Sequence, residues 1–515
     1  MYSEDDHGVP KEKRHGVSVS AKEVDSAAQL AVDFSGALDP EEALRIRRKI
    51  DKHILPMMCS KVQFMDKTTL GNSTALGIMN ATNLTVNHYH RLGTIFYLSY
   101  LLFEYPQNLA LQRFPVGRWL SINILIWGIA LSCHAACKNF TGLFIVRFLL
   151  GMCEGSITAG FLIVSGMFYT RKEQTTRVGY WFLMNGTAQI VSGLLAFGTL
   201  HFKTTGFEPW QWFMIITGTI TMALAVFYWF FFPDSPTTAW FFTADERIKA
   251  VQRIKENQTG VENKHFKMEQ FIEAIRDYKT WLFAFFVVLD NIPNSLTNQQ
   301  TLIVSSLGFT YFQTTLLACI PGVVEIVTIW TSVKLATIRN DGRAYVGAIY
   351  FVPALIGIAV VNLLPWSNKA GLLIGQFMSI TSVPGFVLGL SWLGTVTAGH
   401  TKRVVTNAII LSAYCIGNAL GPLMWKAQYK PRNHIPWAVI AACNVVCPII
   451  LLVIRSLLDR ENRRRDAEPS DEVEEYYIEK TTEDGKVIKV KVDKASNIEF
   501  MDLTDRQNRD FRYVL

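Results

Sequence analysis

Charged side chains inside long apolar runs are the residues of this 515-residue sequence most able to do chemistry. A charge at the centre of a membrane helix costs about 2.5–3.5 kcal/mol on insertion, so charges that remain there usually face the protein interior or a wet cavity. The members of this set are Asp66, Lys67, Glu104, Arg147, Glu154, Asp290 and Glu325. We expect them to bind a charged solute, to carry a proton or to hold helices together.

Arg147 and Glu154 are the pair whose spacing is most informative. Seven residues at about 100° each return the two side chains to nearly one helix face, about 10 Å apart along the axis. Gly151 and Gly155 lie between and beside them, so another backbone or a ligand can approach closely. In the functional interpretation Arg147 attracts an anion and Glu154 carries a proton. The alternative is a buried network that joins helices.

Lys67 lies well inside an apolar run and therefore needs a partner there. The carboxylate of a substrate is one candidate. Asp66 is another, although adjacent side chains point about 100° apart on a helix. Both alternatives stay open.

Polar side chains cluster around Pro293 in a later apolar run. They are Asp290, Asn291, Asn294 and Asn298. Proline interrupts the hydrogen bonds of a helix, and broken helices with free amides are typical of transporter substrate sites. We predict that Asn291 and Asn294 contact the substrate. Glu325, in the following run, is either a second proton site or a structural partner.

Two further amides, Asn185 and Gln189, lie one helical turn apart in another apolar run. Amides in such runs often serve only as hydrogen bonds between helices. We favour that structural role for both.

Several motifs of other protein classes are missing from the sequence. It has no Gly-x-x-x-x-Gly-Lys-Ser/Thr pattern, which argues against an ATP-driven pump. It has no His-Glu-x-x-His and no Gly-x-Ser-x-Gly, so a hydrolase has no support. The eight cysteines show no metal-ligand spacing. We therefore expect no enzyme, no cofactor and no metal site.

The elements that carry these residues are apolar segments of about 20 residues, which is the length that crosses a bilayer. Hydrophobic residues make up 50% of the chain and charged residues only 18%, which argues against one large soluble domain. The segments form two series of six: 53–79, 91–111, 118–137, 141–168, 177–200 and 210–232, then 280–304, 311–336, 344–364, 370–398, 403–427 and 436–457. The pattern predicts an all-α multi-pass membrane protein with twelve transmembrane helices in two six-helix bundles.

The connections between these segments differ in their lysine and arginine content, and the positive-inside rule then places both termini in the cytosol. The net charge of +7 is clustered beside the apolar runs, which favours contact with anionic lipid over nucleic acid. The expected domains are a cytosolic tail at 1–52, a bundle at 53–232, a cytosolic loop at 233–279, a second bundle at 280–457 and a solvated cytosolic tail at 458–515.

Several motifs resemble those of the major facilitator superfamily, and within it the anion:cation symporter family and its fungal allantoate permease-like branch. The motifs include Asp-Lys-Thr-Thr-Leu-Gly-Asn at 66–72, Arg-Phe-Leu-Leu-Gly-Met-Cys-Glu-Gly at 147–155, Pro-Asp-Ser-Pro at 233–236 and Asp-Leu-Thr-Asp at 502–505. The resemblance implies a central site, alternating access and proton-coupled uptake of small organic anions such as allantoate, ureidosuccinate or nicotinate. The family's fourth-span arginine and glutamate map onto Arg147 and Glu154, and its first-span basic position maps onto Lys67.

The sequence departs from the family pattern at two places. Gln112 replaces an acidic residue in the superfamily's loop signature, and the seventh span has amides where some members carry an arginine. Lys67 and Arg147 would then meet most of the substrate charge.

The leading hypothesis is a proton-driven importer of a small nitrogen-containing carboxylate, monomeric and placed in the plasma membrane, with protons and the lipid bilayer as its other partners. A nutrient sensor that binds without transport and an exporter driven by proton antiport are the alternatives.

Overall fold

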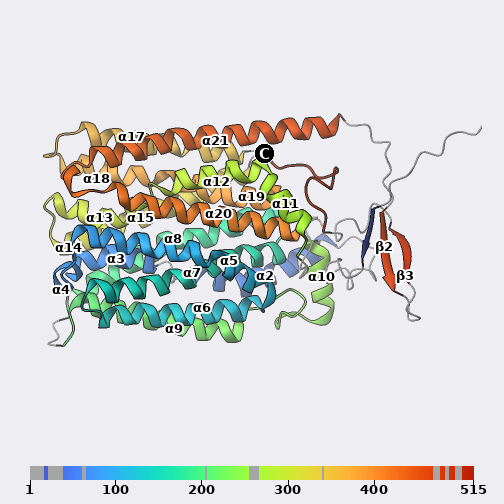
Figure 1. The fold of residues 1–515 in the computed structure, drawn as a ribbon, viewed down its shortest axis with the longest axis horizontal. Coiled ribbons are helices and arrows are strands. Elements are labelled where there is room, and N and C mark those ends of the chain that lie inside the picture. Colours follow the sequence, from blue (N-terminus) through green and yellow to red (C-terminus); the bar gives the residue numbers. More distant parts are fainter. Residues whose placement is uncertain are drawn as a thin grey trace, which may run out of the picture.

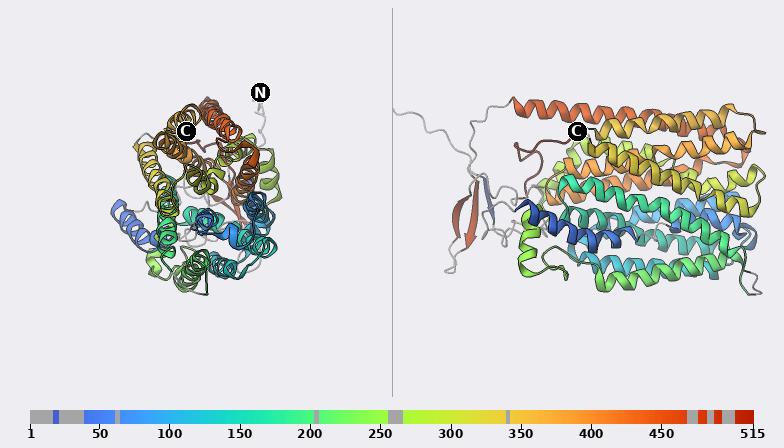
Figure 2. Two further views of the ribbon diagram at one scale, coloured as in Figure 1. Left: turned by 90° about the vertical axis from the view of Figure 1, so that its left-hand side faces the viewer. Right: turned by 180° about the vertical axis from the view of Figure 1, so that it is seen from behind.

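The computed structural model describes residues 17–20, 39–60, 65–202, 206–254, 266–338, 342–467, 476–481, 487–492 and 502–515. Figure 1 shows long helices lying side by side along one axis. The end-on view of Figure 2 separates an earlier group, coloured blue to green, from a later group, coloured yellow to red.

The earlier group is built around α7, which packs against α5 and α6, while α6 also packs against α9. The bounds of its helices are α2 (Pro40–Cys59), α3 (Met65–Ala75), α4 (Ile78–Ala81), α5 (Val86–Arg113), α6 (Val116–Cys133), the 3-10 turn η2 (His134–Ala136), α7 (Phe140–Phe168), α8 (Arg171–Thr199) and α9 (Pro209–Phe231). Helix α2 runs across the predicted boundary at residue 52, because Ile50, Ile54 and Met57 continue one buried face.

The later group follows two short helices, α10 (Ala244–Ile254) and α11 (Met268–Arg276). Within it α12 and α16 pack against α21, and α17 packs against α18. Its elements are α12 (Tyr278–Asn291), α13 (Ser295–Ser306), α14 (Tyr311–Leu317), α15 (Ile320–Ile338), α16 (Arg343–Ile349), α17 (Phe351–Leu363), α18 (Lys369–Met378), η4 (Ser379–Ser382), α19 (Val383–Val396), α20 (His400–Leu420), η5 (Gly421–Met424), η6 (Ala427–Tyr429) and α21 (His434–Asp466).

Strands form a small sheet beyond one end of the helices (Figure 1). β2 (Tyr476–Thr481) is central, with β1 (Val17–Ser20) parallel to it and β3 (Val487–Val492) antiparallel. The register pairs Val17 with Tyr476 and Tyr476 with Val492.

Eight helical stretches of the described chain are long and apolar enough to cross a membrane. They are Val116–Ala136, Phe140–Phe168, Pro209–Phe231, Tyr311–Ile338, Arg343–Leu363, Lys369–Val396, His400–Met424 and His434–Asp466. The other four predicted segments are also helical, as α3 with α4, α5, α8, and α12 with α13. The break between α12 and α13 falls at residues 292–294, where the Pro293 pattern predicted one.

The two groups meet along α8 and α15, α5 and α20, and α3 and α13. Gly186 and Gly322 explain how closely α8 approaches α15. A Cβ atom placed on either glycine would lie 2.4 Å from the carbonyl oxygen of the other. Only glycine therefore fits at this crossing.

Residues 502–515 pack against the later group, although the sequence predicted a solvated tail. The backbone of the segment is tied to α19 and α21. Trp392 Nε1 donates to the Val514 carbonyl at 2.6 Å, Arg465 to the Phe511 carbonyl at 2.7 Å, and Asn462 to the Tyr513 carbonyl at 2.8 Å. The prediction failed because apolar Phe511 and Tyr513, both buried, interrupt the charged composition.

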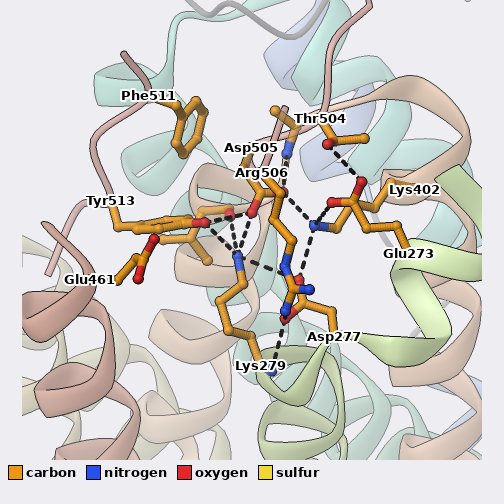
Figure 3. A network of polar contacts seen from close by, with 12 residues as sticks. Glu273, Asp277, Lys279, Lys402, Glu461, Thr504, Asp505, Arg506, Phe511 and Tyr513 are labelled. Carbon is orange, nitrogen blue, oxygen red and sulfur yellow. Dashed lines mark hydrogen bonds and ion pairs between the residues drawn. The ribbon is translucent and has the colours of Figure 1, made fainter. Parts of the chain in front are cut away.

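Asp505 is the centre of a buried charge cluster, which we call the Asp505 cluster (Figure 3). Its carboxylate accepts from Lys279 Nζ at 2.5 Å, from Lys402 Nζ at 2.7 Å and from the Tyr513 hydroxyl at 2.7 Å. Lys402 Nζ also lies 2.9 Å from Asp277. Burial disfavours the ionised carboxyl, but the two ammonium groups outweigh it and hold the pKa of Asp505 well below its usual range. The cluster joins α12 and α20 to the 502–515 segment.

Candidate functional site

A cavity lies between the two groups of helices. It encloses about 1290 Å³, counting its open mouth. Its wall takes residues from α3, α5, α7 and α8 of the earlier group and from α12, α13, α15, α19, α20 and α21 of the later one. A movement of one group against the other would therefore reshape this site.

Two carboxylates face the cavity, Asp290 from α12 and Glu325 from α15. Glu325 is buried and accepts a hydrogen bond from Gln189 Nε2 on α8 at 2.5 Å. This bond crosses from one group to the other. The structure thus gives Gln189 the interhelical role favoured from the sequence and puts Glu325 in a position from which it can reach both the cavity and the crossing of α8 with α15.

The predicted substrate contacts Asn291 and Asn294 both line the cavity. Their amides belong to a chain of hydrogen bonds with α20. Asn294 Nδ2 donates to Asn418 Oδ1 at 2.7 Å, and Asn418 Nδ2 donates to Asn291 Oδ1 at 3.1 Å. Asn291 Nδ2 donates to the Val287 carbonyl at 2.8 Å. The break in the helix therefore places both amides at the cavity. Several of their polar atoms are already hydrogen-bonded to other groups of the protein.

Asn185 also lines the cavity, although the sequence favoured a structural role for it. The side chain is only 4% exposed. Its Oδ1 atom is buried and has no hydrogen-bond partner among the described residues. In the sequence, only its position in an apolar run pointed to a role for Asn185. Gln189, one turn away, has the same position and a structural role, so the sequence does not separate the two residues.

Four aromatic rings form a continuous row on the cavity wall. Tyr97 on α5 and Tyr414 on α20 have ring centroids 6.1 Å apart, and Phe386 on α19 lies 5.7 Å from Tyr414. Phe182 on α8 extends the row, 5.8 Å from Phe386. The sequence does not distinguish these four rings, because aromatic residues make up 12% of the chain and nothing in the spacing of these four sets them apart.

Arg147 and Glu154 are buried in α7, but other residues form the described cavity wall. Arg147 donates to Thr69 Oγ1 on α3 at 3.5 Å. Glu154 lies close enough to Glu104 for their charges to interact, and the wall residue of this helix is Thr158, one turn further on. The structure brings Glu154 near another acid on α5, and the predicted roles of Arg147 and Glu154 stay predictions.

The glycine beside this pair serves helix packing. A Cβ on Gly151 would lie 2.1 Å from the Phe96 carbonyl oxygen, so this glycine lets α7 contact α5. Lys67 lies on α3 and its side chain is outside the described residues. Its neighbour Thr68 lines the cavity.

Contacts between α5 and the later group join the two groups at the end of the bundle opposite to the 502–515 segment. The Tyr89 hydroxyl donates to the Asn298 carbonyl at 2.9 Å, and His90 Nδ1 lies 3.1 Å from Gln299 Nε2. Thr94 donates to the Ala419 carbonyl at 3.4 Å. These contacts must break before the cavity can open widely at that end.

A sequence model of the Major Facilitator Superfamily matches residues 57–422. The chain belongs to this superfamily. Among its relatives are a thiamine pathway transporter of Saccharomyces cerevisiae, 33% identical with 98% of this chain and 92% of the relative covered, and the allantoate permease of the same yeast, 31% identical with 96% and 90% covered. A high affinity cysteine transporter of that organism is 30% identical, with 93% and 92% covered.

The fold of this superfamily member resembles a bacterial homologue of the human lysosomal transporter Spinster, solved in an inward-facing and occupied conformation. The TM-score is 0.52 at 13% identity, with 78% of this chain and 95% of that chain covered. The protein is thus a multi-pass membrane transporter of the allantoate permease-like branch of the superfamily, and it is not an enzyme.

Proposed function

We propose that this protein is a proton-coupled secondary transporter that imports a small nitrogen-containing carboxylate through the cavity by alternating access. The observation that carries the proposal is the hydrogen bond from Gln189 to Glu325. A carboxylate accepts a stronger hydrogen bond than the neutral acid does. Protonation of Glu325 therefore weakens a contact between the two groups of helices, which couples the proton to their relative movement.

The proposed topology has twelve transmembrane helices in two bundles, at 53–232 and 280–457, with both termini in the cytosol. Helices α5 and α8 support it because they have 28 and 29 residues, long enough to cross about 30 Å of hydrocarbon at about 1.5 Å per residue. Charge in these helices is tolerated where neighbours bury it. We place the protein in the plasma membrane as a monomer.

The substrate class follows from the relatives' names and from the cavity. Allantoate and cysteine are named as substrates of two relatives, and we extend from them to a small polar organic solute. The proposed binding residues are Lys67, Arg147, Asn291 and Asn294, and the proposed proton carriers are Glu154 and Glu325. Asn291, Asn294 and Glu325 line the cavity, which supports their part in this proposal.

Uptake of labelled allantoate, ureidosuccinate, nicotinate and cysteine, the last a carboxylate with an ammonium group that is named for one relative, in a permease-null yeast strain tests the proposal. We expect accumulation of at least one solute, rising as the external pH falls and stopping when a proton uncoupler is added. Glu325→Gln should abolish accumulation and retain exchange of solute across the membrane. Asp245→Asn, which changes an exposed acid on α10, is the matched control. Accumulation that persists unchanged with the uncoupler, or in Glu325→Gln, would overturn the coupling.

A further inference from the structure

Four side chains of the cavity wall donate hydrogen bonds within the protein. Gln189 donates to Glu325, Asn294 donates to Asn418, and Asn291 donates to a backbone carbonyl of its own helix. The Thr68 hydroxyl donates to the Met65 carbonyl at 2.7 Å. A substrate that needed many donors from these side chains would have to break bonds that stabilise the wall.

Acceptors, in contrast, remain available at the cavity. Asp290 lines it with a carboxylate that can accept several hydrogen bonds. Asn185 lines the same cavity, and its buried Oδ1 has no hydrogen-bond partner among the described residues. A buried acceptor left unsatisfied costs about 1–3 kcal/mol. A substrate group that brings N–H donors removes this cost, whereas a carboxylate brings none.

Charge and aromatic surface favour the same kind of group. Asp290 and Glu325 both line the cavity. Coulomb attraction to these two carboxylates stabilises a positive charge inside it. The row of Tyr97, Tyr414, Phe386 and Phe182 adds π faces, which attract cations within about 6 Å of a ring centroid. These are independent properties of the wall, and each selects a compact cation.

We infer that the cavity recognises a protonated amine, which is held between Asp290, the Asn185 carbonyl and the row of aromatic rings. This inference rests on the proposed function, since it takes the cavity to be the substrate site. The nitrogen of the transported carboxylate is then an ammonium group, and the solute is a zwitterion while bound. The amine of the solute binds beside Asp290 on α12, and its carboxylate binds at a different part of the site.

Binding to purified full-length protein in detergent tests the inference without requiring transport. The probes are benzylamine, 4-(aminomethyl)benzoate, benzoate and benzylurea, which share one ring and differ in charge. Their affinities are obtained from the rise in thermal unfolding midpoint with probe concentration. We expect the two ammonium probes to bind at least about tenfold more tightly than benzoate, a difference of about 1.4 kcal/mol. Benzylurea separates charge from N–H donors alone and should bind more weakly than benzylamine.

Asp290→Asn is the decisive variant because it keeps the shape of the side chain and removes its charge. We expect it to weaken benzylamine binding at least about tenfold and not to weaken benzoate binding, because a negative charge is removed from the cavity. Asp245→Asn is again the matched control and should alter neither. If Asp290→Asn does not fold, Phe386→Leu removes one ring of the row instead and should lower the affinity for benzylamine while sparing benzoate.

The inference is overturned if benzoate binds as tightly as benzylamine, if benzylurea matches benzylamine, or if Asp290→Asn and Phe386→Leu both leave benzylamine binding unchanged. Its failure differs from failure of the proposed function. Proton-driven uptake of carboxylates with no amine binding removes only the inference. Amine binding with no uptake by the same protein in cells removes only the transport proposal.

Discussion

Single side chains at two places of this transporter couple charge to the packing of helices. Glu325 accepts from Gln189 across α8 and α15, and Asp505 accepts from two lysines of α12 and α20. Both carboxylates are buried, so the loss of one partner leaves a polar group with fewer hydrogen bonds than it can make. Substitution at either place should therefore show in stability as well as in transport.

Gln189→Leu removes the donor of Glu325 and leaves its buried carboxylate less well satisfied. We expect a loss of stability of about 1–3 kcal/mol, seen as a lower thermal unfolding midpoint of the purified protein. Glu325→Gln keeps an amide acceptor for Gln189 and should lose less. A Gln189→Leu protein as stable as the original would show that the bond contributes nothing to the crossing.

Asp505→Asn removes one of the two carboxylates that Lys279 and Lys402 share, the other being Asp277, and breaking such a buried pair costs about 3–5 kcal/mol. The pH dependence has a definite sign. Because the pKa of Asp505 is lowered in the folded protein, its contribution is complete above the ordinary carboxyl range and is lost only as pH falls toward the lowered value.

The substitution should therefore lower the unfolding midpoint by the same amount at about pH 5 and about pH 7.5. Thermal unfolding of both proteins across this range is the measurement. An effect of Asp505→Asn that disappears at the lower pH would contradict the lowered pKa. Asp245→Asn serves as the control for a change of one net charge.

At the scale of the element, glycine decides how the two groups of helices fit. A methyl group at position 186 of α8 would lie 2.4 Å from the Gly322 carbonyl oxygen, and backbone atoms cannot rotate away as a side chain can. The contact between α8 and α15 is thus set by two residues with no side chain, directly beside the bond between Gln189 and Glu325.

Gly186→Ala should force α8 and α15 apart, lowering stability by about 1–3 kcal/mol and reducing uptake. Gly198→Ala is a matched control on the same helix, because a Cβ there meets no atom within 4 Å. The control should be neutral or slightly stabilising, since alanine favours helix over glycine by up to about 1 kcal/mol. Unfolding midpoints and uptake rates of the two variants decide the matter. Equal behaviour would show that the crossing yields to an added methyl group.

The sequence predicts elements well wherever apolar length or a local break determines them. The position of Pro293 indicated the interruption between α12 and α13, and the charged residues at 233–279 separated the two series of helices. It predicts the cavity wall less well, because the wall combines side chains far apart in the chain. Phe182, Phe386 and Tyr97 look like ordinary membrane aromatics until packing brings them together.

The same limit explains the 502–515 segment. Its composition is that of a solvated tail, and only the partners on α12 and α20 show that Asp505 is buried. Asp505 can be buried because Lys402 and Lys279 supply positive charge beside it. These lysines lie 103 and 226 residues earlier in the chain.

At the scale of the whole molecule, two sets of contacts with different functions lie at opposite ends. The Asp505 cluster lies within the later group, whereas Tyr89 with Asn298 and His90 with Gln299 join the earlier group to the later one. Alternating access needs the second set to break and re-form, while the first can remain intact throughout.

A disulfide between cysteines introduced at His90 and Gln299 should hold the two groups together at the end opposite to the 502–515 segment. We expect oxidation of this double variant to lower uptake at least about tenfold and a reductant to restore it. Each single cysteine variant, treated in the same way, controls for the native thiols. Uptake that is unaffected by a confirmed cross-link would mean that this end does not open during transport.

Residues 502–515 also follow every helix of the bundle in the order of synthesis. Lys279 and Lys402 are translated before Asp505, and among the described residues their other acidic partners are Asp277, which pairs with both, and Glu273, which pairs with Lys402. A nascent chain that stops before position 502 keeps this unfinished arrangement permanently. A chain without this segment lacks Asp505 and should therefore be less stable, and lower stability exposes a protein to cellular degradation.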